Sequence, residues 1–399
     1  MTAAMSTVPV HRFDPTACGF PRPRVPVLPT MRGACLNWTA NDLRREVRHF
    51  ARGRYALLAA YRLAGVGPTG ALLAPAYHCR TMFDPALRLG ADVGFYPLTA
   101  ALAPDLERLR QVLLSSREPV KAMLLTHFFG FAQDTAAVGQ LCAEHGVTLI
   151  EDCSHALAPI DAAPGNTARG IGTTGRYAVA SPYKFFPCPD GGLLWRNDPA
   201  APLPAQPGSP GAKAELRALL QVFRQWRTAP GALNAHAVDA ELQAPAARAS
   251  HPGRQWTDAQ AGPSAEYQGA DETIGSTATS RWLMRHAHIG HISAMRRARY
   301  AQWAEAVAGL RGVRALWPAL PVGCTPYMFP LLVERADACF YPLKHLGMPL
   351  WRWDEMAASG CAVAHSYRLN LFHLPCHQAL SDAEMAWMTS AVARVVGKT

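Results

Sequence analysis

The chain has 399 residues and a formal net charge of +10, and it is 49% hydrophobic but only 17% charged. It can therefore bury a large core, which excludes a disordered chain and a highly charged coiled coil. No apolar run reaches the roughly 18 residues of a membrane span. The ten cysteines show no paired spacing, which excludes a secreted disulfide scaffold. We expect a cytoplasmic protein with reduced thiols.

The first 40 residues are rich in proline and lack the apolar core of a signal peptide, so we expect an N-terminal arm. Beyond it, Asp42 can cap a helix that carries Leu43, Val47 and Phe50 on one face. Further helices are expected at 55–63, 102–114 and 135–145, and strands at 71–75, 93–96, 121–126 and 147–152. Apolar strands separated by amphipathic helices are typical of a mostly parallel sheet covered on both faces.

The composition changes after Trp195. Five prolines between positions 199 and 210 predict an irregular insertion at about 199–279, in which 214–226 has helical spacing. Residues 281–307 are predicted to form one long helix, followed by a strand at 327–333 and a helix at 381–396. We therefore expect a large α/β domain at 41–280 and a smaller α+β domain at 281–399.

Arginines gather at positions 44–54 and again at 296–299. Neither group lies in a nucleic-acid-binding motif, and few aromatic residues are interleaved with them. A solvated helix face explains most of these side chains. We expect no nucleic-acid partner and no membrane partner, although the positive charge is compatible with a phosphorylated small ligand.

Two residues at the predicted sheet edge have the chemistry that pyridoxal phosphate (PLP) requires. Asp152 ends an apolar strand, and Lys184 follows about thirty positions later in a stretch flanked by glycine-rich turns. Lysine supplies an amine for covalent attachment of the cofactor, and a carboxylate keeps the pyridine nitrogen protonated. The pair alone is weak evidence, because any α/β protein contains an aspartate and a lysine.

Six segments that surround this pair make the pattern more specific. They are 51–57 (ARGRYAL), 73–79 (LAPAYHC), 126–130 (THFFG) with Asp134, 149–156 (LIEDCSHA), 184–192 (KFFPCPDGG) and 374–380 (LPCHQAL). In this order they resemble the motifs of the DegT/DnrJ/StrS family of sugar aminotransferases. The resemblance covers about 45–195 and 280–395. It implies the PLP-dependent transferase fold type I, with a mostly parallel central sheet flanked by helices and a smaller C-terminal α+β domain.

The resemblance implies a role for each matching residue. Lys184 would hold PLP and move the substrate proton, Asp152 would pair with the pyridinium nitrogen, and His155 would hydrogen-bond the phenolic oxygen. Gly53 and Arg54 would bind the phosphate at a helix start. Ser181 would donate its hydroxyl there, although many relatives place that serine where this chain has Val179.

The position that stacks on the cofactor ring aligns with Cys79, which has no aromatic face, so Tyr77 or His78 would substitute for it. A metal site at His373 and His377 is disfavoured because Pro375 interrupts their helical spacing. No metal is expected.

As a member of this family the chain would be a homodimeric aminotransferase. It would move an amino group from an amino acid, glutamate in most relatives, to a nucleotide-linked keto sugar for polysaccharide or secondary-metabolite biosynthesis. Relatives carry a G-x-N-x-R segment after the lysine, and region 205–279 of this chain lacks it. Two alternatives therefore stay open: another PLP reaction, such as that of a lyase or desulfurase, and a non-catalytic or regulatory protein of the same fold.

Overall fold

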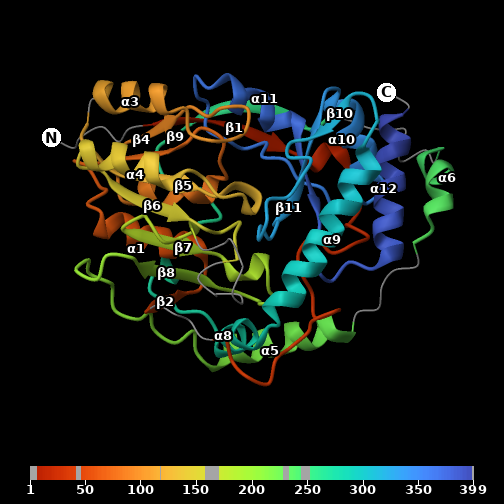
Figure 1. The fold of residues 1–399 in the computed structure, drawn as a ribbon, viewed down its shortest axis with the longest axis horizontal. Coiled ribbons are helices and arrows are strands. Elements are labelled where there is room, and N and C mark those ends of the chain that lie inside the picture. Colours follow the sequence, from red (N-terminus) through yellow and green to blue (C-terminus); the bar gives the residue numbers. More distant parts are fainter. Residues whose placement is uncertain are drawn as a thin grey trace.

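A seven-stranded sheet lies at the centre of the computed structural model, which describes residues 7–41, 46–116, 118–157, 170–227, 233–243 and 252–397. The strand order is β2-β8-β7-β6-β5-β3-β4 (Figure 1). The bounds are β2 Val47–Phe50, β3 Ala71–Pro75, β4 Val93–Tyr96, β5 Val120–Thr126, β6 Thr148–Asp152, β7 Tyr177–Ala180 and β8 Gly192–Arg196. Strand β8 runs antiparallel to both of its neighbours, and the remaining pairings are parallel.

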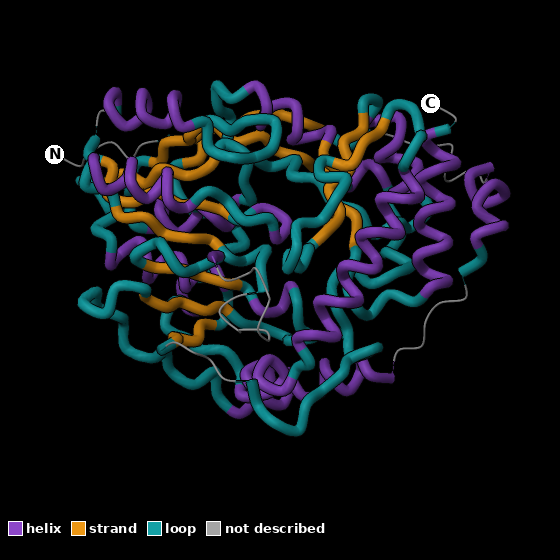
Figure 2. The backbone as a smooth tube through the Cα atoms, in the orientation of Figure 1, coloured by secondary structure: helices purple, strands orange, loops and turns teal. Residues whose placement is uncertain are grey.

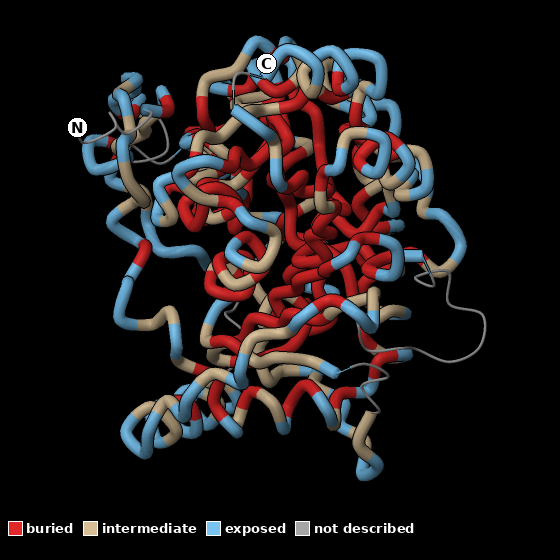
Figure 3. Tube along the Cα trace, turned by 90° about the vertical axis from the view of Figure 1, so that its left-hand side faces the viewer, coloured by how far each residue is buried: buried red, intermediate tan, exposed pale blue. Residues whose placement is uncertain are grey.

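Helices cover the sheet on both faces because successive strand residues point to opposite sides. Leu72 packs in one cluster with residues of α1 (Gly53–Leu63) and α2 (Asp84–Arg88). Leu73 packs in another cluster with residues of α3 (Leu106–Ser115) and α4 (Thr135–Glu144). Burial on both sides explains why these strands read as continuous apolar runs, and Figure 3 shows the resulting buried centre.

A second sheet has the antiparallel order β10-β11-β12, with bounds Val313–Ala315, Met328–Val333 and Leu371–Pro375. Helices α8 (Ala278–His286), α9 (Ile289–Val307), α10 (Ala336–His345), α11 (Ala362–Asn370) and α12 (Asp382–Val396) belong to the same C-terminal half. Figure 2 shows that helices predominate around this smaller sheet. Helix α12 begins with a capping box between Ser381 and Glu384. The boundary at 280/281 stays a prediction.

Two sequence-based element predictions are wrong. The helix expected after Asp42 is strand β2, because Val47–Phe50 pairs with β8 in the central sheet; residues 42–45 lie outside the described part of the chain. The long helix expected at 281–307 is two helices. Ala287 is extended (ψ 139°), and the His288 side chain accepts a hydrogen bond from the His291 N–H, which caps α9.

The N-terminal arm and the insertion are joined by a ribbon that the sequence does not predict. Strand β1 (Val8–Asp14) pairs antiparallel with β9 (Arg254–Gln260) over seven residues. The insertion also contains α5 (Ala212–Arg227) and α6 (Val238–Gln243). The expected helix at 214–226 is therefore confirmed as α5, whereas the wider region is more regular than its composition indicates.

Candidate functional site

The predicted site residues meet at one edge of the central sheet. Asp152 ends β6 and is buried, and Lys184 lies in a short 3-10 turn, Pro182–Lys184, that follows β7. Strands β5, β6 and β7 are parallel, with Thr126 opposite Asp152 and Asp152 opposite Val179. Their carboxyl ends therefore share the edge at which open α/β sheets bind ligands.

His155 lies between the sheet edge and the C-terminal half of the chain. Its buried ring stacks on Tyr327 at a centroid distance of 4.5 Å, and the Lys184 Nζ atom is 5.3 Å from the centroid of the same Tyr327 ring. Burial holds the pKa of His155 well below its usual value, and the charges of Lys184 and His373 lower it further. His155 Nδ1 accepts a hydrogen bond from the Phe129 N–H at 3.3 Å, so the neutral ring has its N–H at Nε2.

Arg296 of α9 fixes the backbone of the lysine turn. Its Nη2 donates to the Lys184 carbonyl at 2.8 Å, and its Nη1 donates to the carbonyls of Tyr327 and Pro326 at 2.9 and 3.1 Å. Its Nε donates to Gln378 Oε1, and Gln378 Nε2 donates to the Phe185 carbonyl. Burial lowers the pKa of Arg296 to about 10, so the group stays a cation at neutral pH.

This role was not predicted from the sequence. The arginines at 296–299 were expected mostly on a solvated helix face, whereas Arg296 and Arg299 are buried, because their guanidinium groups bind carbonyl oxygens and side chains of the C-terminal half.

Gly53 brings the first turn of α1 against Ser181. A Cβ atom at Gly53 would clash with Ser181 Oγ, so the hydroxyl can take this place only beside a glycine. The Ser181 hydroxyl donates to the Ser154 hydroxyl at 3.0 Å. Backbone N–H groups at a helix start together with two hydroxyls form a suitable cradle for a phosphate. The Arg54 side chain instead binds the carbonyl and carboxylate of Glu266.

Tyr77 and His78 are both fully buried. The Tyr77 hydroxyl bonds His373 Nε2 at 2.7 Å. Both ring nitrogens of His78 bond backbone, to the Pro75 carbonyl and the Ala357 N–H, and burial lowers its pKa to about 4. We interpret His78 as a structural residue. Trp353 lies 4.5 Å from the Tyr77 ring and 5.9 Å from the His155 ring, and no sequence pattern pointed to it.

One buried cluster has metal-ligand chemistry. Ligand atoms of His127, Glu151 and Cys153 lie within 4.8 Å of one another. The Glu151 carboxylate already accepts hydrogen bonds from His127 Nε2 and from the backbone N–H groups of residues 172, 174 and 175. These bonds hold the turn that leads into β7, which accounts for the cluster. The prediction that the site uses no metal stays a prediction.

Residues 46–203 match the DegT/DnrJ/EryC1/StrS aminotransferase family. This is the family that the sequence motifs resemble, and five of the six motif segments lie inside the matched range. A pleiotropic regulatory protein of Geobacillus stearothermophilus is 28% identical over 155 residues, a match that covers 37% of this chain and 38% of the relative's length.

Solved structures agree over a longer range. The aminotransferase TlmJ from Streptoalloteichus hindustanus superposes with a TM-score of 0.60 at 20% identity, covering 88% of this chain and 86% of the other. Helicobacter pylori PseC, an aminotransferase involved in the biosynthesis of pseudoaminic acid, superposes with a TM-score of 0.60 at 13% identity, covering 89% of this chain and 88% of the other. These likenesses confirm the predicted fold, that of PLP-dependent transferases of type I. Within the described ranges no helix is long and apolar enough to cross a membrane.

Proposed function

We propose that the chain is a PLP-dependent aminotransferase that moves an amino group from an amino acid to a keto sugar. The observation that carries this proposal is the meeting of Asp152, His155 and Lys184 at one sheet edge, inside the segment that matches the family. PLP, when bound, supplies a pyridine ring that accepts electron density from the substrate. The donor set fits this group: a buried carboxylate, a neutral imidazole, an amine and a glycine-serine cradle.

Each residue would hold one part of the cofactor. Asp152 would pair with the ring nitrogen and keep it protonated, because a buried carboxylate favours an adjacent cation. The Nε2–H of His155 would donate to the phenolic oxygen. Gly53, the backbone of Arg54, and the Ser181 hydroxyl would bind the phosphate.

Lys184 would carry the proton that the reaction moves at the substrate carbon. Its backbone is held by the Arg296 hydrogen bond, and its amine lies over the Tyr327 ring. The remaining freedom of the lysine is therefore mostly in its side chain. This arrangement suits a group that must take up and return a proton without losing its place.

The finer identity of the substrates rests on similarity to other proteins. We propose glutamate as donor and a nucleotide-linked keto sugar as acceptor, used in polysaccharide or secondary-metabolite biosynthesis. Similar folds include a putative sugar aminotransferase from Streptococcus pneumoniae and the H. pylori protein already described.

Trapping of the cofactor tests the proposal. Purified protein mixed with PLP is expected to show visible absorbance, and borohydride reduction should add the cofactor mass to the peptide that contains Lys184. Lys184→Ala should abolish both signals. Lys213→Ala removes an exposed lysine of α5 and should leave both unchanged. Equal labelling of Lys184→Ala and the original chain would refute the proposal.

Amino-donor half-reactions separate this function from the alternatives. Conversion of bound PLP to pyridoxamine phosphate by glutamate supports transamination. Another PLP reaction would instead release a fragment of the amino acid. The regulatory alternative gains support from the name of the G. stearothermophilus relative. It would be favoured if PLP bound and no amino acid in a broad panel changed it.

We also propose that the chain works as a homodimer in the cytoplasm. Helix α5 exposes one apolar face, which contains Leu216, Leu219, Leu220, Phe223 and Trp226. Their spacing puts them on one side of the helix, and such faces are usually covered by a partner. Light scattering should give twice the chain mass, and Leu220→Glu should halve it. A monomeric mass for the original chain would contradict the proposal.

A further inference from the structure

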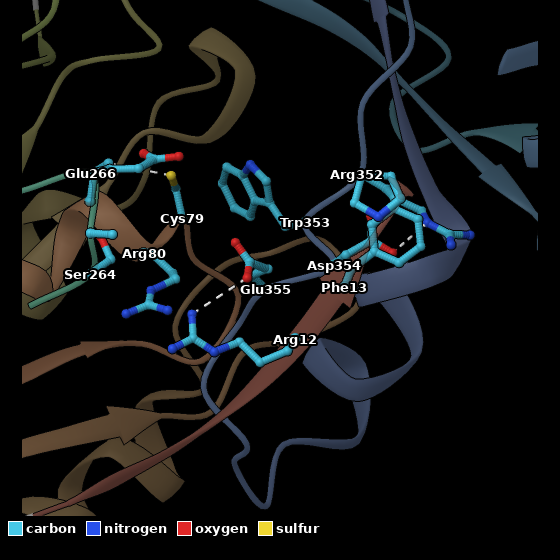
Figure 4. A pocket seen from close by; sticks show the side chains of 13 residues that line it. Arg12, Phe13, Cys79, Arg80, Ser264, Glu266, Arg352, Trp353, Asp354 and Glu355 are labelled. Atoms are coloured by element: carbon cyan, nitrogen blue, oxygen red, sulfur yellow. Dashed lines mark hydrogen bonds and ion pairs between the residues drawn. The ribbon is translucent and has the colours of Figure 1, made fainter. Parts of the chain in front are cut away.

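A pocket of about 530 Å³ lies beside the proposed cofactor site (Figure 4). Its lining includes Cys79 and Arg80, which follow β3, Trp353 from the C-terminal half, and Ser264 from the insertion. Trp353 connects the two sites, because its ring lines the pocket and also lies 5.9 Å from the ring of His155. A substrate that reacts near His155 could therefore extend past Trp353 into this space.

Arg80 lines this pocket as a buried cation with unused donors. The residue is 6% exposed, and its Nε and Nη1 atoms have no hydrogen-bond partner among the described residues. Its Nη2 reaches Asp84 Oδ1 at the long distance of 3.5 Å. Asp84 in turn accepts hydrogen bonds from the backbone N–H and the hydroxyl of Ser264. Nε and Nη1 are themselves buried in this conformation, so an anion in the pocket would bind the guanidinium at Nη2 or after a small rotation of the side chain. Because burying an underpaired guanidinium is unfavourable, such a ligand would stabilise Arg80.

The other charged groups of the pocket are already paired. Arg12 binds Asp258 at 3.0 Å, Glu355 at 3.5 Å and the side chain of Gln260. Glu266 pairs with Arg54.

Arg352 binds two carboxylates, Asp337 and Asp354, each at 2.9 Å, and its guanidinium lies 3.7 Å from the Phe340 ring centroid. One of its nitrogens, Nη2, has no hydrogen-bond partner among the described residues. Among the described arginines that line the pocket, Arg80 therefore has the largest unused donor capacity.

We propose that the pocket beside Trp353 binds an anionic group of the substrate, a phosphate or a carboxylate, through the guanidinium of Arg80. This proposal rests on the proposed function, because the ligand is a substrate only if the chain is an aminotransferase. Binding of an anion can nevertheless be measured without turnover. Both oxyanions offer the charged acceptors that a guanidinium prefers. Cys79, which the resemblance places where relatives stack an aromatic ring on the cofactor, lines the same pocket.

The test is calorimetric titration of PLP-saturated protein with three probes: inorganic pyrophosphate, uridine diphosphate and L-glutamate. Arg80→Met should lower the affinity for at least one probe by about 10- to 100-fold, the range expected for the loss of a charged hydrogen bond. Arg80→Lys should restore part of the loss. Weaker pyrophosphate and uridine diphosphate binding with unchanged glutamate identifies a phosphate subsite. The reverse pattern identifies a carboxylate subsite.

Arg88→Met is the matched control, because Arg88 is an exposed arginine of α2 that pairs with Glu272. It removes the same charge from the same region and should change no affinity by more than about twofold. Equal affinities of the original chain and a folded Arg80→Met for all three probes would overturn the inference. Failure of the aminotransferase proposal gives a different result, namely pyrophosphate binding that depends on Arg80 without conversion of PLP by any donor.

Discussion

Arg296 and Arg80 are both buried arginines, and their surroundings differ in one respect. Arg296 uses all three of its nitrogens on carbonyl oxygens and on Gln378, and its guanidinium lies 4.4 Å from the Phe185 ring centroid. Arg80 keeps two nitrogens without a partner in the described structure and faces a pocket. The guanidinium of Arg296 is fully paired within the protein, whereas that of Arg80 is not. Whether its hydrogen-bond donors are paired, more than how deeply it is buried, therefore separates a structural arginine from one that can bind a ligand.

Loss of Arg296 should have the largest effect on stability. Arg296→Met leaves the carbonyls of Lys184, Pro326 and Tyr327 without this donor. Because each buried acceptor left unpaired costs about 1–3 kcal/mol, we expect the free energy of unfolding to fall by about 3–5 kcal/mol. Urea unfolding measures this change. Arg394→Met, which removes an exposed arginine paired with Asp239, should stay within about 0.5 kcal/mol. If the free energy of unfolding fell no further for Arg296→Met than for the control, Arg296 would not be a structural residue.

Acid should weaken both regions, because each contains buried neutral histidines. Burial lowers the pKa of His377, near Arg296, to about 3 and that of His78, near Arg80, to about 4. The unfolded chain takes up these protons near pH 6.5 and the native chain does not, so stability is complete above that pH and falls below it. The loss should be on the order of 1 kcal/mol per pH unit for each histidine.

Urea unfolding at a series of pH values measures this slope. His377→Gln and His78→Gln should each lower the number of protons taken up on unfolding, which sets this slope, by about one. A free energy of unfolding that does not change between about pH 6.5 and about pH 5 would contradict the expectation.

Loss of Arg80 should have the smallest effect on folding. Arg80→Met removes an underpaired charge, while Asp84 keeps its two hydrogen bonds from Ser264. Removal of the buried cation is stabilising, and loss of its ion pair with Asp84 is destabilising. Because these two contributions oppose each other, we expect the free energy of unfolding to change by less than about 1 kcal/mol. The same urea experiment measures it. A loss as large as that of Arg296→Met would mean that Arg80 is also structural, and the contrast between the two arginines would disappear.

The placement of the candidate site residues could be expected from short motifs, and their roles only from the resemblance of those motifs to a family. Asp152, His155 and Lys184 lie at strand ends, where a short apolar run followed by polar residues has a clear signature. Gly53 was predicted for its helix start, and the structure adds the close approach to Ser181 that requires a glycine. These features depend on a few neighbouring residues, which is why the pattern contains them.

The missed features depend on contacts between distant segments. Arg296 reaches Lys184 across 112 positions, and Trp353 meets Tyr77 from the other half of the chain. Strand β2 has helical spacing and becomes a strand because β8 offers it a free edge. His78 lies beside Cys79 in the sequence, but its ring is held by the Ala357 N–H, 279 positions away, in addition to the nearby Pro75 carbonyl. In each case a partner far away in sequence decides the outcome.

The ribbon of β1 and β9 has a consequence for how the chain is made. Thr257 lies opposite His11 and follows it by 246 positions. At ribosomal rates of about 5–20 residues per second, β1 waits on the order of 10–50 s for its partner strand to be synthesised. During that time its edge is open to pairing with other chains. Pro9, which lacks an N–H, and the charged Arg12 make β1 a poor template for such pairing, so the strand carries its own protection against aggregation until β9 arrives.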